Sequence, residues 1–188
     1  KNNSNLLLIT RNDKFGLGYN DFISFCKKIN NMKNLKLEGL SVHIGSQITS
    51  IQPFKKVLSI INKIISKTNI NFKFIDLGGG MGISYSQKER ALDLNQYAKL
   101  VEKFLKNKKS KIIFEPGRFI AANTSILISK VIYIKKNKNK TFIILDAGMN
   151  DLMRPALYDA QHEIMPIRKS NKKMIGKIEF VGPICEST

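Results

Sequence analysis

Short runs of β-branched and aromatic residues alternate along the chain with longer stretches whose apolar residues recur at helical spacing. The expected strands are residues 39–44, 72–77 and 111–115. The expected helices are residues 21–32, 54–67 and 94–107. Strand, turn and helix repeating at about 35 residues is typical of βα units, which build a parallel sheet.

Two of these helices have well-defined apolar faces. The face of 54–67 carries Phe54, Val57, Leu58, Ile61, Ile64 and Ile65. The face of 94–107 carries Leu94, Tyr97, Leu100, Val101, Phe104 and Leu105. We expect both faces to be buried, and we expect Asp21 to be the N-cap of the first helix.

Residues suited to chemistry come at the ends of the three strands. His43 lies near the end of the first, glycines 78–80 follow the second, and Glu115 ends the third. The carboxyl ends of parallel strands meet at one edge, which carries the active site of a (β/α)8 barrel. Because a closed barrel needs eight strands, the sequence indicates an α/β fold that is the C-terminal part of a TIM-like barrel. An open parallel sheet is the alternative.

The pattern changes near residue 125. Residues 126–136 and 140–148 indicate two strands joined by a basic turn, and 177–184 indicate another strand after an irregular stretch. The absence of a helical pattern between the first two favours antiparallel β structure. We therefore expect a partial barrel over 1–125 and the start of an antiparallel β domain over 126–188.

Composition adds limits but little chemistry. The chain has 188 residues, of which 43% are hydrophobic, which is enough for a sizeable core. No apolar run approaches the roughly 20 residues of a membrane span, and the N-terminal residues do not resemble a signal peptide. We expect a cytoplasmic protein in which Cys26 and Cys185 are reduced.

The net charge of +18 raises the question of a nucleic-acid partner. The lysines are dispersed among Asn and Ile residues, which favours solvated faces, and no nucleic-acid-binding motif accompanies them. We expect no nucleic-acid or membrane partner, with a polyanion site as the alternative. We also expect no metal site, because neither His43 nor His162 lies in a cluster of carboxylates.

The segments FIDLGGGMG and SVHIGSQ have the composition of ligand-binding turns. Consecutive glycines allow several N–H groups to approach a phosphate, and the alternative is a tight turn that needs positive φ. His43 can stack on a planar ring or transfer a proton, while Gly45 and Ser46 can bind a phosphate. A half-buried histidine bound to the backbone is the alternative.

The segment EPGR consists of Glu115, Pro116, Gly117 and Arg118. If the ligand is pyridoxal phosphate, a carboxylate against the pyridine nitrogen keeps that nitrogen protonated and strengthens the ring as an electron acceptor. Gly117 and Arg118 then lie near a phosphate or a substrate carboxylate. The alternative is a structural Glu115–Arg118 ion pair.

Together these segments resemble the fold-type III pyridoxal-phosphate decarboxylases, whose barrel is alanine-racemase-like, and within them the diaminopimelate decarboxylase family. The matching segments, in order, are KFGLG (14–18), LSVHIGSQ (40–47), DLGGGMGISY (76–85), EPGR (115–118), LDAGMNDLMRPALYDAQHEI (145–164) and VGPICEST (181–188). The run MNDLMRPALY is the most specific, because ornithine and arginine decarboxylases share the glycine-rich turn and EPGR but not this run.

The resemblance implies roles for the residues of the cofactor site. It places His43, a catalytic residue, over the cofactor ring and Glu115 at the pyridine nitrogen. The residues implied to bind the cofactor are His43, Ser46, Gly79, Gly80, Glu115, Pro116, Gly117 and Arg118.

The resemblance also implies a substrate site and a homodimer whose active sites are shared across the interface. Arg118, Arg154 and Tyr158 hold the substrate carboxylates. Cys185 donates a proton in the partner subunit's site, where Glu186 binds the distal amino group of the substrate. Without the resemblance, Arg154 and Tyr158 are expected to serve surface and core packing in a β domain, and Cys185 is expected to be a small buried hydrophobic residue.

The implied activity is removal of CO2 from meso-2,6-diaminopimelate to give L-lysine, the last step of lysine biosynthesis. The alternatives are a decarboxylase of arginine, ornithine or carboxynorspermidine, a basic nucleic-acid-associated domain, and a catalytically silent paralogue. The lysine to which this family attaches its cofactor has no matching motif here, so we expect residues 1–188 alone to be inactive.

Overall fold

The computed structural model describes residues 15–29, 31–86, 89–168 and 176–185. The chain divides into two compact units. The first contains residues up to 84 together with 90–124, and the second contains 85–89 together with 125–188. Segment 85–89 therefore belongs with the second unit, although the chain pattern alone assigns it to the first domain.

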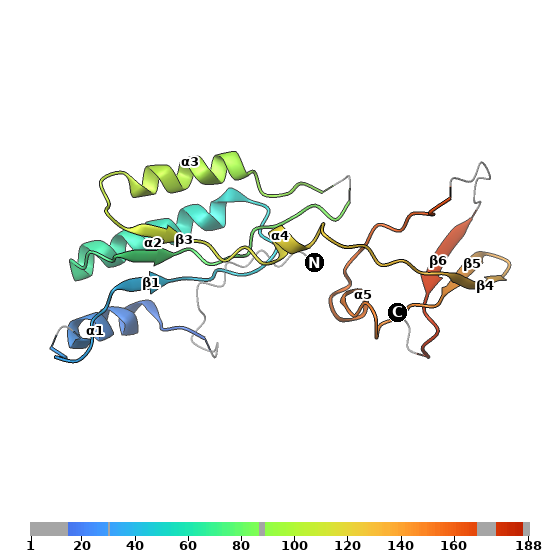
Figure 1. Ribbon diagram of the computed structural model, residues 1–188, viewed down its shortest axis with the longest axis horizontal. Coiled ribbons are helices and arrows are strands. Elements are labelled where there is room, and N and C mark those ends of the chain that lie inside the picture. Colours follow the sequence, from blue (N-terminus) through green and yellow to red (C-terminus); the bar gives the residue numbers. More distant parts are fainter. Residues whose placement is uncertain (1–14, 30, 87–88, 169–175, 186–188) are drawn as a thin grey trace. The chain divides into compact units, whose positions relative to one another are not determined.

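The first unit is built on a three-stranded parallel sheet in the order β1-β2-β3 (Figure 1). The strands are β1 (Gly39–Ser41), β2 (Phe74–Asp76) and β3 (Lys111–Ile113). The predicted parallel pairing is confirmed, but the strands are shorter than the apolar runs. Backbone pairing continues for one further step, since the N–H of Val42 donates to the Asp76 carbonyl at 2.9 Å and the N–H of Leu77 donates to the Ile113 carbonyl at 3.0 Å.

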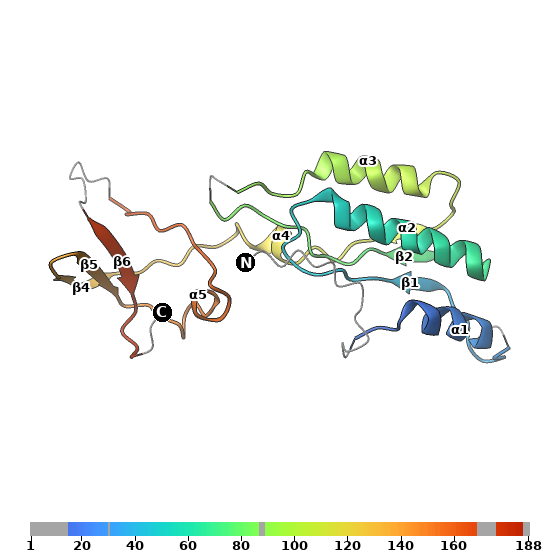
Figure 2. The ribbon, with the colours of Figure 1, turned by 180° about the vertical axis from the view of Figure 1, so that it is seen from behind.

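Three long helices accompany this sheet, as Figures 1 and 2 show from opposite sides. They are α1 (Tyr19–Ile29), α2 (Ile51–Thr68) and α3 (Leu94–Leu105). The Ser50 hydroxyl caps α2 by accepting from the N–H of Gln52, and the Asp93 carboxylate caps α3 by accepting from the N–H of Gln96. The prediction of Asp21 as a cap is wrong, because α1 begins at Tyr19 and Asp21 lies in its first turn.

The core of the first unit lies between the helices and one face of the sheet. Leu40 and Ile75 are paired in register and buried. The predicted helix faces are largely confirmed by the buried residues Phe54, Val57, Leu58, Ile61, Ile64, Tyr97, Val101 and Phe104. Leu94 is instead 43% exposed, because it is the first residue of α3. On the other face of the sheet, Phe74 and Ile113 are exposed.

The second unit contains a three-stranded sheet in the order β4-β5-β6. Its strands are β4 (Val131–Lys136), β5 (Lys140–Leu145) and β6 (Lys177–Val181). The expected antiparallel pairing is confirmed for β4 and β5. The prediction that the third strand also runs antiparallel is wrong, because β6 pairs parallel with β5 and the sheet is mixed. The chain between β5 and β6 is long enough to return to the starting edge, and it contains the short helix α5 (Arg154–Tyr158).

No helix in the part of the chain that the structure describes is long and apolar enough to cross a membrane.

Candidate active site

The loops after β1, β2 and β3 lie together at the carboxyl edge of the parallel sheet and are joined by backbone hydrogen bonds. The N–H of Glu115 donates to the Gly78 carbonyl at 2.9 Å. The N–H of Gly78 donates to the Asp76 carboxylate at 2.8 Å, and the Ser41 hydroxyl donates to the same carboxylate at 3.1 Å. The sheet thus brings the predicted residues of the first unit to one edge.

The turn Gly78–Gly79–Gly80 passes too close to its neighbours for any side chain. A Cβ at Gly78 would overlap the Val42 carbonyl oxygen, one at Gly79 the Glu115 carbonyl oxygen, and one at Gly80 the Gly45 carbonyl oxygen. Gly78 and Gly80 also have φ of +64° and +82°, a region that favours glycine. These contacts and angles account for the glycines as a close-packed turn, whether or not a phosphate binds there.

His43 and Ser46 are exposed beside this turn. The His43 Nδ1 accepts a long hydrogen bond of 3.4 Å from the N–H of Gly79. Because Nδ1 is the acceptor, the neutral ring carries its proton on Nε2. The ring of His43 is therefore oriented by the glycine turn. No group of three or more His, Cys, Asp or Glu residues suited to a metal occurs among the described residues.

Glu115 and Arg118 follow β3 in the EPGR segment but do not pair with each other. In the part of the chain that the structure describes, no ion pair joins their side chains. The Glu115 side chain is exposed, whereas Arg118 begins the short helix α4 (Arg118–Ala121), and its Nη1 donates to Gln47 Oε1 at 3.3 Å. The alternative of a structural Glu115–Arg118 ion pair is wrong.

Gln47 is a site residue that the sequence did not single out. Its side-chain amide donates to the Ile83 carbonyl at 2.6 Å and accepts from the Ile83 N–H at 3.3 Å, while it also receives the Arg118 guanidinium. Gln47 therefore links the loop after β1 both to the chain beyond the glycine turn and to EPGR. Its φ of +57° and its partners depend on the folded loops, so no sequence signal pointed to it.

In the second unit, the RPALY run forms α5, with Pro155 in its first turn, where a proline is favourable. The Arg154 guanidinium lies over the Tyr85 ring, 4.7 Å from its centroid. Arg154 Nη1 is 3.3 Å from His162 Nε2. Tyr158 is 73% exposed, so it does not pack in the core of a β domain.

His162 completes this cluster. Its ring meets the Tyr85 ring edge to face, with centroids 5.6 Å apart. Burial lowers the pKa of His162, and the Arg154 charge lowers it further. Neither His162 nor Tyr85 was predicted as a site residue, because the two are far apart in sequence and only the fold brings them together.

Cys185 is a free, exposed thiol, so the alternative of a buried hydrophobic residue is wrong. The segment before it is anchored by close packing, since a Cβ at Gly182 would meet the Gly148 Cα at 2.6 Å. The VGPIC segment and the turn that begins the MNDLMRPALY run therefore contact each other. Glu186 lies outside the described residues.

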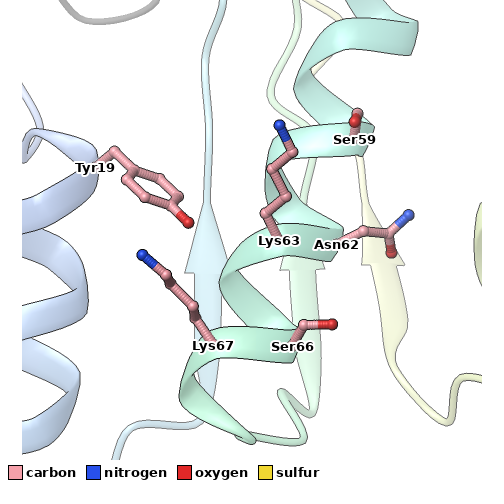
Figure 3. A pocket seen from close by; sticks show the side chains of 6 residues that line it. All are labelled: Tyr19, Ser59, Asn62, Lys63, Ser66 and Lys67. Atoms are coloured by element: carbon pink, nitrogen blue, oxygen red, sulfur yellow. The ribbon is translucent and has the colours of Figure 1, made fainter.

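A shallow pocket lies elsewhere, between α1 and the second half of α2 (Figure 3). Its lining residues are Tyr19, Ser59, Asn62, Lys63, Ser66 and Lys67. Because α2 returns from the carboxyl edge of the sheet towards the start of β2, this half of α2 lies near the opposite edge. None of the predicted site residues lines the pocket.

Comparison with known proteins identifies the family. Residues 5–122 match the family model described as pyridoxal-dependent decarboxylase, pyridoxal binding domain. The chain is 41% identical over 179 residues to the diaminopimelate decarboxylase of Aquifex aeolicus, an alignment that covers 93% of this chain and 42% of that protein. The chain thus spans less than half the length of this relative.

Solved structures agree with this match. The chain is similar to the crystal structure of diaminopimelate decarboxylase from Helicobacter pylori complexed with L-lysine, with a TM-score of 0.81 and 38% identity over 94% of this chain and 44% of that one. A lysine/ornithine decarboxylase from Vibrio vulnificus, complexed with cadaverine, has a TM-score of 0.80 at 20% identity, covering 94% of this chain and 49% of that chain. This second likeness shows a shared fold alone. The chain belongs to the pyridoxal-dependent decarboxylases, and residues 5–122 correspond to their pyridoxal-binding domain.

Proposed function

We propose that the full-length protein removes CO2 from meso-2,6-diaminopimelate at its D-configured centre to give L-lysine. The observation that carries this proposal is the 41% identity to a diaminopimelate decarboxylase across 93% of the chain, which includes the MNDLMRPALY run. The fold alone does not choose the substrate, because a lysine/ornithine decarboxylase shares it.

The residues at the carboxyl edge of the first sheet fit pyridoxal phosphate. Among the residues that the structure describes, the N–H groups of Gly80 and Gly117 have no hydrogen-bond partner, and open space surrounds Gly117 where a Cβ would lie. Both N–H groups can therefore donate to a phosphate, together with the exposed Ser46 hydroxyl. The Glu115 carboxylate is exposed and can accept from a protonated ring nitrogen.

Bound at this edge, pyridoxal phosphate supplies an electron-poor ring that accepts the electron pair left when CO2 departs. Glu115 would hold the proton on the ring nitrogen, and His43 would contact the ring. Ser46, Gly79, Gly80 and Gly117 would hold the phosphate.

The remaining residues act on the substrate. Arg118, Arg154 and Tyr158 bind its carboxylates and fix its orientation, because a guanidinium offers several N–H donors to a carboxylate. Cys185 donates a proton to the carbon that has lost CO2, and Glu186 binds the distal amino group. Recognition of the carboxylate that remains after the reaction favours diaminopimelate over ornithine and lysine.

We also propose that the protein is a homodimer, in which Cys185 and Glu186 of each subunit serve the other subunit's site. Cys185 is exposed and follows a segment fixed by the Gly182–Gly148 contact, which suits a residue presented to a partner. A role in lysine biosynthesis in the cytoplasm follows from the proposed reaction and is supported by two unpaired thiols, Cys26 and Cys185.

The proposed activity is tested by CO2 release from the full-length protein with added pyridoxal phosphate. Meso-diaminopimelate, ornithine and arginine are supplied in parallel. Release from diaminopimelate alone supports the proposal. Release from ornithine or arginine would retain the cofactor chemistry and reject the role of Arg154, and release from none would reject the activity.

Glu115→Ala tests the role of the carboxylate in the same protein. We expect kcat to fall by about a hundredfold or more, since the charge at the ring nitrogen is lost. The cofactor should remain bound through its phosphate, as followed by its absorbance. Glu115→Asp is the matched control and should keep more activity than Glu115→Ala. An unchanged kcat in Glu115→Ala would reject this role for Glu115.

A further inference from the structure

The Arg154 side chain is held between two groups that the proposed reaction does not use. The Tyr85 ring lies under the guanidinium, 4.7 Å from its central carbon to the ring centroid. His162 Nε2 lies 3.3 Å from Arg154 Nη1. The Tyr85 and His162 rings also contact each other at 5.6 Å, nearly perpendicular at 74°. The three side chains form one packed cluster within the second unit.

The hydrogen bond between Arg154 and His162 has only one direction. An arginine side chain has N–H donors and no acceptor, so His162 Nε2 accepts and carries no proton. The neutral state that this requires agrees with the lowered pKa of His162, which burial and the Arg154 charge both cause. His162 therefore orients the guanidinium without compensating its charge.

The Tyr85 contact restrains the guanidinium in another direction. A guanidinium over the face of an aromatic ring is attracted by the ring quadrupole and packs flat against it. The hydrogen bond occupies one edge of the guanidinium and the ring covers one face. The N–H groups at the other edge remain available as a rigid fork of donors. The two contacts together restrain the position of the Arg154 guanidinium.

Arg154 has no carboxylate partner in the described part of the chain. Every ion pair found there is made by a lysine, and none involves Arg154. The side chain is nonetheless half-buried, so its charge is partly desolvated without a counter-ion. Such a guanidinium is suited to an anionic ligand, because a carboxylate restores the missing charge compensation.

We propose that His162 and Tyr85 are positioning residues, which hold the Arg154 guanidinium ready for the carboxylate that the substrate keeps after CO2 has left. This inference rests on the proposed function, in which Arg154 binds that carboxylate. A guanidinium oriented before binding loses less conformational freedom when the ligand arrives. Loss of either positioning residue therefore weakens carboxylate binding in particular.

The test compares two ligands that differ only in the carboxylate. L-lysine, the proposed product, carries it, and cadaverine is the same molecule without it. The dissociation constant of each is measured by calorimetry on the full-length protein loaded with pyridoxal phosphate. In His162→Ala, L-lysine binding should weaken by about threefold to tenfold, the range for one lost hydrogen bond, while cadaverine binding stays unchanged.

Conservative variants separate positioning from folding. His162→Gln supplies an acceptor oxygen and should restore L-lysine binding to within about twofold of the wild type. Tyr85→Phe keeps the ring and should behave like the wild type, whereas Tyr85→Leu removes the ring and should weaken L-lysine binding as His162→Ala does. The KM for diaminopimelate should rise in His162→Ala and Tyr85→Leu with little change in kcat.

The Arg154→Met variant distinguishes a failure of this inference from a failure of the proposed function. It should weaken L-lysine binding by about tenfold or more. If Arg154→Met leaves the dissociation constant of L-lysine unchanged, Arg154 does not bind the carboxylate. Both the proposed role of Arg154 and the positioning by His162 and Tyr85 are then rejected. If Arg154→Met weakens binding but His162→Ala and Tyr85→Leu do not, only the positioning is rejected. Equal weakening of L-lysine and cadaverine by His162→Ala also rejects it, because that result indicates a general structural loss.

Discussion

At the scale of single residues, Gly79 and Gly117 differ clearly in the space available for a side chain. Gly79→Ala places a methyl group onto the carbonyl oxygen of Glu115, whereas Gly117→Ala places one in open space. The overlap at Gly79 is with backbone, which a rotamer change does not relieve. We expect Gly79→Ala to lower the melting temperature clearly, by several degrees for a loss of about 1–3 kcal/mol.

Gly117→Ala is the control for this comparison. Its φ of −75° is negative, and no atom lies within 4 Å of an added Cβ, so the melting temperature should stay within about two degrees of the wild type. Differential scanning fluorimetry of both full-length variants is the measurement. If Gly79→Ala melts at the wild-type temperature, the close approach of Gly79 to the EPGR backbone is not required by the fold.

His162 gives a prediction about pH. Burial and the Arg154 charge hold the pKa of His162 below its ordinary value of 6.5 in the folded protein. Below pH 6.5 the unfolded chain therefore binds more protons at His162 than the folded chain does. Its contribution to the free energy of unfolding consequently declines as the pH falls from about 6.5 through the folded pKa. An NMR titration of the His162 ring protons measures that pKa.

The Arg154→Met variant again provides the comparison. Removing the positive charge should raise the pKa of His162, which should still remain below 6.5 because burial is the larger cause. A titration unaffected by this substitution would show that the guanidinium does not lie beside the ring.

How far the sequence predicted the site depends on the kind of signal each residue left. His43, the glycine turn and Glu115 were predicted to share an edge, because their strands could be read from the apolar runs and parallel strands align their ends. Gln47 and Tyr85 were missed, since their roles arise from contacts with Arg118 and Arg154 across long stretches of chain. No local pattern records such contacts.

At the scale of elements, helix α3 buries the Tyr97 hydroxyl group, which is expected to destabilise the fold. Tyr97 packs on Phe54, with ring centroids 4.4 Å apart, and meets Phe114 edge to face. In the part of the chain that the structure describes, its hydroxyl is buried without a hydrogen-bond partner. Burial raises the pKa of Tyr97 to about 12, which keeps the hydroxyl neutral.

Tyr97→Phe should therefore leave the protein as stable as the wild type or more stable by up to about 1 kcal/mol, because the ring stays and the unpaired hydroxyl is removed. Tyr133→Phe, at a 62% exposed position on β4, is the matched control and should change nothing. Thermal melting of both variants is the measurement. A lower melting temperature in Tyr97→Phe alone would show that the hydroxyl has a partner in the full-length protein.

The elements also show which features the apolar pattern predicts and which it does not. The apolar period predicted the buried faces of α2 and α3, since a helix that covers a sheet must bury one stripe. It did not predict that β6 runs parallel to β5. The alternation of side chains along a strand is the same in both directions, and strand direction depends on the path of the connection, which here includes α5.

At the scale of the whole chain, both units expose apolar side chains that we expect the full-length protein to cover. Phe74 and Ile113 lie on the sheet face opposite the helices, and the inner face of a closed barrel is filled by such residues. In the second unit, β4 is an edge strand with all its residues exposed. An exposed apolar edge strand is prone to pair with another chain.

Residues 1–188 expressed alone should consequently associate, whereas the full-length protein should be a discrete dimer. Size-exclusion chromatography with light scattering over a range of concentrations measures both.

Ile134→Lys, which puts a charge at a 49% exposed position on β4, should reduce the association of residues 1–188, because a charge on an edge strand opposes pairing. Ile126→Lys is the control, since Ile126 is 84% exposed but lies before β4. If residues 1–188 stay monomeric at every concentration, these exposed apolar faces do not drive association. If both lysine variants suppress association equally, the effect comes from net charge and not from the edge of β4.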